Sequence, residues 1–211
     1  MPNSVSSNLP IPTITNNSPP AVKIELFRSL FRGREDVYPR RFESRKTGKA
    51  GYAPACANEW VRGVCEKPRI KCTDCPNRRF LSITDEVIGW HLSGRDGRGF
   101  GFVMGVYAML QDETCFFMAV DFDDEDWQRD AAAFLETCRR LDVPAALERS
   151  RSGNGGHIWI FLKKPFPQLW LANSVRIFSP RRWSTGQKSV SIRTTGFFPT
   201  KIHYPEAGLE T

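Results

Sequence analysis

Apolar and polar residues recur with two different spacings along the chain, and these spacings predict a series of helices and strands. Helices are expected over Thr84–Leu92 and Glu125–Leu141; in the second, acidic residues crowd the first turn and arginines the last. Strands are expected over Phe100–Leu110 and over the largely apolar Thr114–Asp121. Helical and extended patterns therefore alternate from Phe80 onward.

A glycine-rich turn, residues 152–156, separates two further strand patterns. Ala145–Arg149 precedes the turn and His157–Leu162 follows it, which is the composition of a β-hairpin. Together with the elements above, this hairpin predicts a compact α+β unit over residues 80–164.

The other segments lack a sustained period. Residues 1–20 carry no charge and are rich in Pro, Ser and Asn, so a flexible, disordered leader is expected. Residues 21–79 are rich in Gly, Pro, Cys and Arg, as in a loop-rich unit organised by something other than a large core. Residues 165–211 contain no Asp and no pattern longer than a few residues, so we do not expect this tail to fold.

Charge is distributed unevenly over these segments. The 211 residues carry a formal net charge of +7. Residues 32–79 contribute +7 (13 basic and 6 acidic residues), and residues 80–164 contribute −5 (9 basic and 14 acidic residues). A basic unit followed by an acidic one suggests two tasks, holding a polyanion such as nucleic acid and holding cations.

We find no secretory signal and no apolar run of the ~18 residues that a membrane span needs, so a soluble, cytoplasmic protein without membrane contacts is expected.

The cysteines indicate a metal site. In a reducing compartment, clustered thiols are more often metal ligands than disulfides. Four thiols suit tetrahedral Zn²⁺, whereas an iron–sulfur cluster or buried, unliganded cysteines are the alternatives. The four are Cys56, Cys65, Cys72 and Cys75.

Acidic residues follow the apolar strand. Asp121 and Asp123 stand two residues apart at its end, so both carboxylates project to the same side and could hold a divalent metal ion. The alternative is an acidic helix N-terminus, which suits residues 124–126 but not Asp121, because Asp121 ends an apolar run.

The glycine-rich turn carries a second candidate site. Arg149 precedes it, Ser152 and Gly153 open it, and His157 follows it. Glycines let backbone amides approach phosphate oxygens, and the flanking Arg and His add positive charge, so the segment predicts a triphosphate site. A hairpin turn with an incidental histidine is the alternative.

These three features occur together in residues 31–164, which resemble the primase domain of TOTE conflict systems, a branch of the archaeo-eukaryotic primase-polymerase superfamily. The resemblance is carried by the cysteine set and by the segments Asp112–Asp123 and Glu148–Phe161. It implies an RRM-like primase-polymerase catalytic core preceded by a zinc-binding module with four cysteine ligands. It also implies a DNA or RNA template and nucleoside triphosphates as partners, with helicase and nuclease partners acting alongside.

The resemblance assigns a role to each candidate residue. Asp121 and Asp123 match the ligands of Mg²⁺ or Mn²⁺, and His157 matches the contact with the phosphates of the incoming nucleotide. Arg149, Ser152 and Gly153 complete the nucleotide-binding segment. The implied reaction is template-directed nucleotidyl transfer by a two-metal mechanism, with the basic cysteine unit gripping the template through phosphate contacts.

The chain departs from the family after Lys164. The family carries a third metal-binding Asp in a D-R-x-F-P-N-Q-like segment, whereas this chain has no Asp after Asp142. Back-translated into a shifted frame, Arg193–Ile202 can encode Tyr-Asp-Arg-Leu-Phe-Pro-Asn-Gln-Asp. We therefore expect a frameshift near Lys164–Trp170, an out-of-frame tail over residues 165–211, and a protein that is inactive as encoded.

Two other functions fit the same residues. One is a zinc-stabilised nucleic-acid-binding module without catalysis, in which the acidic half is only a scaffold. The other is a metal-dependent nuclease, because two aspartates at the end of a strand serve hydrolysis as well.

Overall fold

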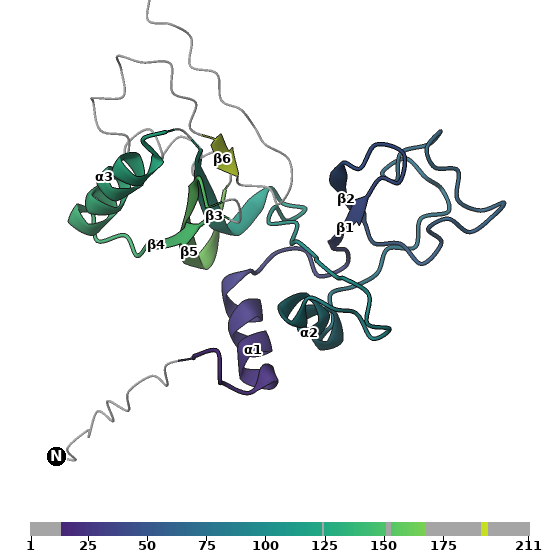
Figure 1. The fold of residues 1–211 in the computed structure, drawn as a ribbon, viewed down its shortest axis with the longest axis horizontal. Helices are drawn as coiled ribbons and strands as arrows, with labels where there is room; N and C mark the ends of the chain where they lie inside the picture. The colour runs from purple at the N-terminus through teal and green to yellow at the C-terminus, as the bar shows by residue number, and fades with distance from the viewer. Residues whose placement is uncertain (1–13, 124, 151–152, 168–190, 194–211) are drawn as a thin grey trace, which may run out of the picture.

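Helices and short antiparallel sheets make up the described part of the chain (Figure 1). The computed structural model describes residues 14–123, 125–150, 153–167 and 191–193. The elements are α1 (Pro20–Leu30), β1 (Pro39–Glu43), β2 (Ala50–Pro54), α2 (Asp85–Ser93), β3 (Thr114–Phe122), α3 (Trp127–Arg140), β4 (Ala146–Arg149), β5 (Gly156–Pro167) and β6 (Ser191–Arg193). This mixture confirms the predicted α+β class. Among the described residues, no helix has the length and apolarity that a membrane crossing requires.

A four-stranded antiparallel sheet in the order β4-β5-β3-β6 forms the centre of the molecule. The predicted hairpin is β4 with β5, and it pairs Glu148 with His157. On its other side β5 pairs with β3, which brings His157 opposite Asp121. Beyond β3, Ser191 of β6 lies opposite Asp121 in the register. One row of residues therefore crosses the sheet at the end of β3.

Helix α3 covers one face of the sheet. Side chains alternate between the two faces of a strand, and every second residue of β3 points toward this helix. The helix forms where its apolar stripe predicts it, and that stripe is buried against the sheet. The resulting core consists of Cys115, Met118, Val120, Phe122, Trp127, Ala131, Phe134, Cys138, Ile158 and Ile160.

An aromatic cluster packs on the opposite face. Phe31, directly after α1, meets the rings of three sheet residues edge to face, at centroid distances of 5.5 Å, 5.3 Å and 5.5 Å. These residues are Phe117, Trp159 and Phe161. Asp121 and His157 share this face by strand alternation, so the candidate site extends the cluster at one end of the sheet.

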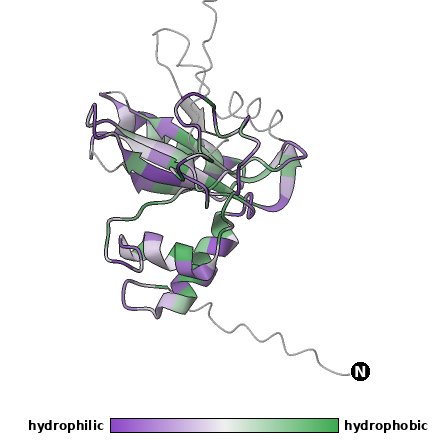
Figure 2. Ribbon diagram, turned by 90° about the vertical axis from the view of Figure 1, so that its right-hand side faces the viewer, coloured by the Kyte–Doolittle hydropathy of each residue, from purple (hydrophilic) through white to green (hydrophobic). Residues whose placement is uncertain are grey.

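Helix α2 begins and ends as predicted. The Thr84 hydroxyl accepts a hydrogen bond from the backbone N–H of Val87 at 3.3 Å and so caps the first turn. Gly94 ends the helix with φ 75°, a left-handed conformation that glycine adopts without strain. Hydrophilic and hydrophobic residues alternate along the helices below the sheet in Figure 2, as expected for helices that bury one side.

The strand predicted over Phe100–Leu110 is wrong, although its alternation is right. Every second side chain is buried, namely Phe102, Met104, Val106 and Ala108. The segment makes only two isolated bridges, Met104 with Arg40 and Gly101 with Arg95, and scattered backbone hydrogen bonds. Without a partner in continuous register, an extended segment buries its apolar side chains but does not become a strand.

Residues 21–79 contain two elements that the sequence pattern did not predict, α1 and the β1–β2 hairpin. Proline at the first helical position suits the start of α1, where the backbone N–H would have no partner. In the hairpin, Phe42 lies opposite Gly51. A Cβ on Gly51 would lie 2.8 Å from the ring of Phe42, so glycine lets this ring lie across the strand pair. Figure 1 shows the hairpin and its long loops on the far side of α2 from α3.

Candidate active site

Three neighbouring strands place an acid, a histidine and a second acid in one row. Nε2 of His157 lies 3.3 Å from Oδ1 of Asp121, and its Nδ1 lies 3.5 Å from Oε2 of Glu148. The exposed fraction of the side chain rises from 1% at Asp121 to 26% at His157 and 57% at Glu148. The imidazole therefore lies between a buried carboxylate and a solvent-facing one.

Glu148 is itself held in place. The indole Nε1–H of Trp159 donates a hydrogen bond of 2.7 Å to Oε2 of Glu148. Because Trp159 belongs to the aromatic cluster, this bond ties the outer acid to the packed face of the sheet. The sequence analysis gave Glu148 no role. With the turn placed at residues 152–156 the sequence does not match Glu148 with His157; their pairing follows from the register of the structure, which also pairs Arg149 with Gly156.

The turn before His157 presses against Asp123. A Cβ added at Gly155 would lie 2.9 Å from Oδ1 of Asp123 and 2.8 Å from the backbone oxygen of Phe122. Real side chains do not tolerate such contacts, so only glycine allows the turn to approach the end of β3 this closely. The fold therefore brings Asp121, Asp123 and His157 to the same end of the sheet, as their spacing predicted.

Arg149 closes the glycine-rich turn. Its Nε donates a hydrogen bond of 3.1 Å to the backbone oxygen of Gly153, which has φ 77°. The backbone N–H of Ser150 donates to the oxygen of Gly155 at 2.9 Å. Arg149 and Gly153 are thus in direct contact, whereas Ser152, the other predicted nucleotide-binding residue, lies outside the described residues.

The carboxylates suit a hard divalent cation. Mg²⁺ binds in polymerase-type sites through one or two carboxylates together with substrate phosphates, and Asp121 and Asp123 supply such a pair. In the ranges that the structure describes, no group of three or more His, Cys, Asp and Glu residues could hold a metal ion by itself. β6 lies in the tail that was not expected to fold; it pairs beside Asp121 and ends at Arg193, where the segment for which a shifted-frame motif is expected begins.

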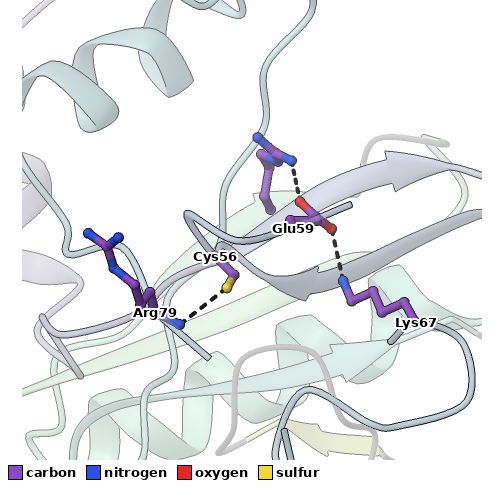
Figure 3. A network of polar contacts seen from close by, with 5 residues as sticks. Cys56, Glu59, Lys67 and Arg79 are labelled. Carbon is purple, nitrogen blue, oxygen red and sulfur yellow. Dashed lines mark hydrogen bonds and ion pairs between the residues drawn. The ribbon is translucent and has the colours of Figure 1, made fainter. Parts of the chain in front are cut away.

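The four cysteines line the same small pocket in the loops after β2. The Sγ atom of Cys56 accepts a hydrogen bond of 3.3 Å from the backbone N–H of Arg79 (Figure 3). Such bonds orient cysteine ligands in metal sites. The thiols suit Zn²⁺ chemically. Within the described part of the chain, however, they are not arranged closely enough to count as a set of metal ligands. The zinc site stays a prediction.

Comparison with known protein families shows which family this chain resembles. A family model described as the archaeo-eukaryotic primase domain of the TOTE conflict system matches residues 22–209. No curated protein matches the chain. The matched range includes the tail for which a shifted frame is expected. The nucleotide sequence is therefore the test of the frameshift hypothesis.

Proposed function

The chain belongs to the archaeo-eukaryotic primase domain family of TOTE conflict systems, and on this premise we propose that it is a template-directed nucleotidyltransferase domain. The observation that carries the proposal is the row of Asp121, His157 and Glu148, with Asp123 and the glycine-rich turn beside it. Family membership supports nucleic acid and nucleoside triphosphates as partners and a divalent metal ion as cofactor.

In this proposal Asp121 and Asp123 hold Mg²⁺ or Mn²⁺. When bound, the metal would neutralise charge on the triphosphate and activate the primer 3′-hydroxyl. Asp121 is buried at the end of a paired strand, so its carboxylate is fixed before substrate arrives. Preorganised charge of this kind costs no rearrangement during the reaction.

His157 binds the phosphates of the incoming nucleotide. About a quarter of its side chain is exposed, and its two ring nitrogens lie 3.3 Å and 3.5 Å from carboxylate oxygens of Asp121 and Glu148. The glycine-rich turn offers backbone amides next to His157, and Arg149, which holds the turn closed, adds positive charge. Ser152 is included in this phosphate-binding segment from the sequence alone.

The cysteine unit is proposed to bind Zn²⁺ through Cys56, Cys65, Cys72 and Cys75 and to hold the template. Residues 32–79 carry 13 basic and 6 acidic residues, and such an excess binds phosphates in a salt-dependent way.

We also propose that the reading frame shifts after Lys164. If it holds, the third carboxylate is absent and the protein is inactive as encoded; an unshifted nucleotide sequence after Lys164 would contradict it.

Primer extension tests the proposal. A labelled primer on a template is incubated with Mn²⁺ and nucleotides, using the chain as encoded and a version with the frame restored after Lys164. We expect extension by the restored chain alone and its loss in the restored Asp121→Ala variant. Failure of the restored chain to extend the primer would contradict the proposal.

The same assay separates the two alternative functions. Cleavage of either strand without extension would indicate a metal-dependent nuclease. Salt-sensitive binding of nucleic acid without synthesis or cleavage by either version would indicate a zinc-stabilised binding module.

A further inference from the structure

Trp60, in the loop between the first two cysteines of the set, is the most exposed of the large hydrophobic side chains in the described residues. Its relative exposure is 69%. Its backbone is also unusual, with φ 63° in the left-handed region. For a bulky residue this backbone conformation is strained. The fold therefore presents an indole to solvent although this strains the backbone and exposes apolar surface to water.

A largely buried acid beside Trp60 links the loop to two basic side chains. The carboxylate of Glu59, 13% exposed, accepts hydrogen bonds from Arg40 of β1 at 2.6 Å and from Lys67 at 2.8 Å (Figure 3). Lys67 Nζ also lies over the Trp60 ring, 5.6 Å from its centroid. The indole is thus fixed next to a cation rather than carried on a loose loop.

Exposed cations occur in the same unit as this loop. Arg62, Lys71 and Arg79 are exposed, and none of them has an ion-pair partner among the residues that the structure describes. The backbone of Arg79 is anchored by its hydrogen bond to Sγ of Cys56. Arg62 follows Trp60 by two residues, so positive charge for a phosphate backbone stands close to the indole along the chain.

We infer that Trp60 is a stacking platform for an unpaired base of single-stranded nucleic acid. A flat aromatic surface next to unpaired cations matches the alternating bases and phosphates of a single strand. A duplex would leave the indole without a partner, because its base faces are stacked inside the helix. An acidic protein would meet the cations but not need the ring. The inference rests on the proposed function, since it places the template strand on the cysteine unit.

Trp60→Gly tests this assignment in the full chain. Glycine is favoured at φ 63°, so thermal stability should stay the same or rise while the platform is removed. Fluorescence anisotropy with a labelled oligothymidine should show affinity falling about 5- to 150-fold, as expected for one stacked base. Trp60→Phe should recover most of the affinity. Binding of a blunt duplex should not change.

Two further variants separate stacking from charge. Arg62→Ala should reduce the slope of log affinity against log salt by about 1, whereas Trp60→Gly should leave that slope unchanged. Phe100→Ala is the matched control, because Phe100 is 67% exposed but lies outside the cysteine unit. It should bind the oligonucleotide like the unchanged chain.

The outcomes keep this inference apart from the proposed function. If the unchanged chain binds single-stranded DNA and Trp60→Gly binds it equally well, the stacking platform is wrong and the proposed function stands. An equal loss in Phe100→Ala also overturns the platform. If the unchanged chain binds no single-stranded DNA even at low salt, the proposed function fails too.

Discussion

Nε2 of His157 lies 3.3 Å from Oδ1 of Asp121 because the two residues face each other across the β3–β5 pair. The pairing is anchored by apolar side chains, with the α3 core on one face and the aromatic cluster on the other. A slip of either strand by one residue would move its polar group to the other face of the sheet and separate the two. The sheet core therefore determines the geometry of the site. Substitutions at the edge of the site should have measurable effects on stability or binding.

Gly155→Ala should disturb the end of β3. The added methyl would lie 2.9 Å from Oδ1 of Asp123, so the carboxylate or the turn must move. We expect a loss of about 1–3 kcal/mol in the free energy of unfolding by urea, and weaker Mn²⁺ binding. Gly101→Ala is the control, because a Cβ there meets nothing within 4 Å. Equal behaviour of the two variants would contradict the close approach.

Glu148→Ala should destabilise the protein by removing the acceptor of the Trp159 indole. The bond is 2.7 Å long and lies on the exposed strand β4, so we expect a loss of about 0.5–1.5 kcal/mol in urea unfolding. Glu148→Gln keeps an acceptor oxygen at the same place and should recover most of that loss. If the Gln and Ala variants are equally unstable, the indole bond is not the cause.

His91 should make stability fall at acidic pH. Burial lowers the pKa of His91 on α2, and its Nδ1 accepts a hydrogen bond of 3.4 Å from the backbone N–H of Met104. The folded chain therefore keeps His91 neutral, while the unfolded chain protonates it as pH falls through about 6.5. The free energy of unfolding should decrease from about pH 7 to pH 5.

The variant His91→Phe isolates this contribution. It keeps a ring beside Phe27, whose centroid is 5.5 Å from that of His91, and removes the titrating group. Urea unfolding at several pH values should show a shallower acid decline for the variant than for the unchanged chain. Parallel curves would show that the decline has another origin.

Zinc content tests the cysteine unit. We expect about one zinc ion per chain in reduced protein, measured by elemental analysis, and its loss in Cys75→Ser. Chelation should lower the thermal midpoint, because metal binding stabilises a loop-rich unit. Cys138→Ala is the control: this buried core residue should be dispensable for zinc. A zinc content near zero in folded, reduced protein would contradict the site.

The elements around the site could be predicted because their patterns are long and local. The apolar run before Asp121, the amphipathic stripe of α3 and the hairpin around the glycine-rich turn each bury one face, and each formed near its expected bounds. Placing Asp121 beside His157 needed one more step, the pairing of β3 with β5, which the structure shows.

What the sequence did not reveal depends on contacts between distant residues. The β1–β2 hairpin relies on Phe42 packing over Gly51, and Phe100–Leu110 stays extended without a continuous partner. Neither effect has a periodic signal. Glu148 was missed for a related reason: it acquires its neighbours His157 and Trp159 only through the hairpin register.

Calorimetry of Mn²⁺ and a nucleoside triphosphate binding to the full chain, as encoded, tests the proposed site most directly, because it needs no turnover. We predict triphosphate binding that requires Mn²⁺ and weakens about tenfold or more in Asp121→Asn, with no loss of thermal stability, since this change removes a buried charge. The exposed Asp142→Asn control should bind normally. Equal binding by Asp121→Asn and the unchanged chain would contradict the assignment of this carboxylate to the metal–nucleotide site.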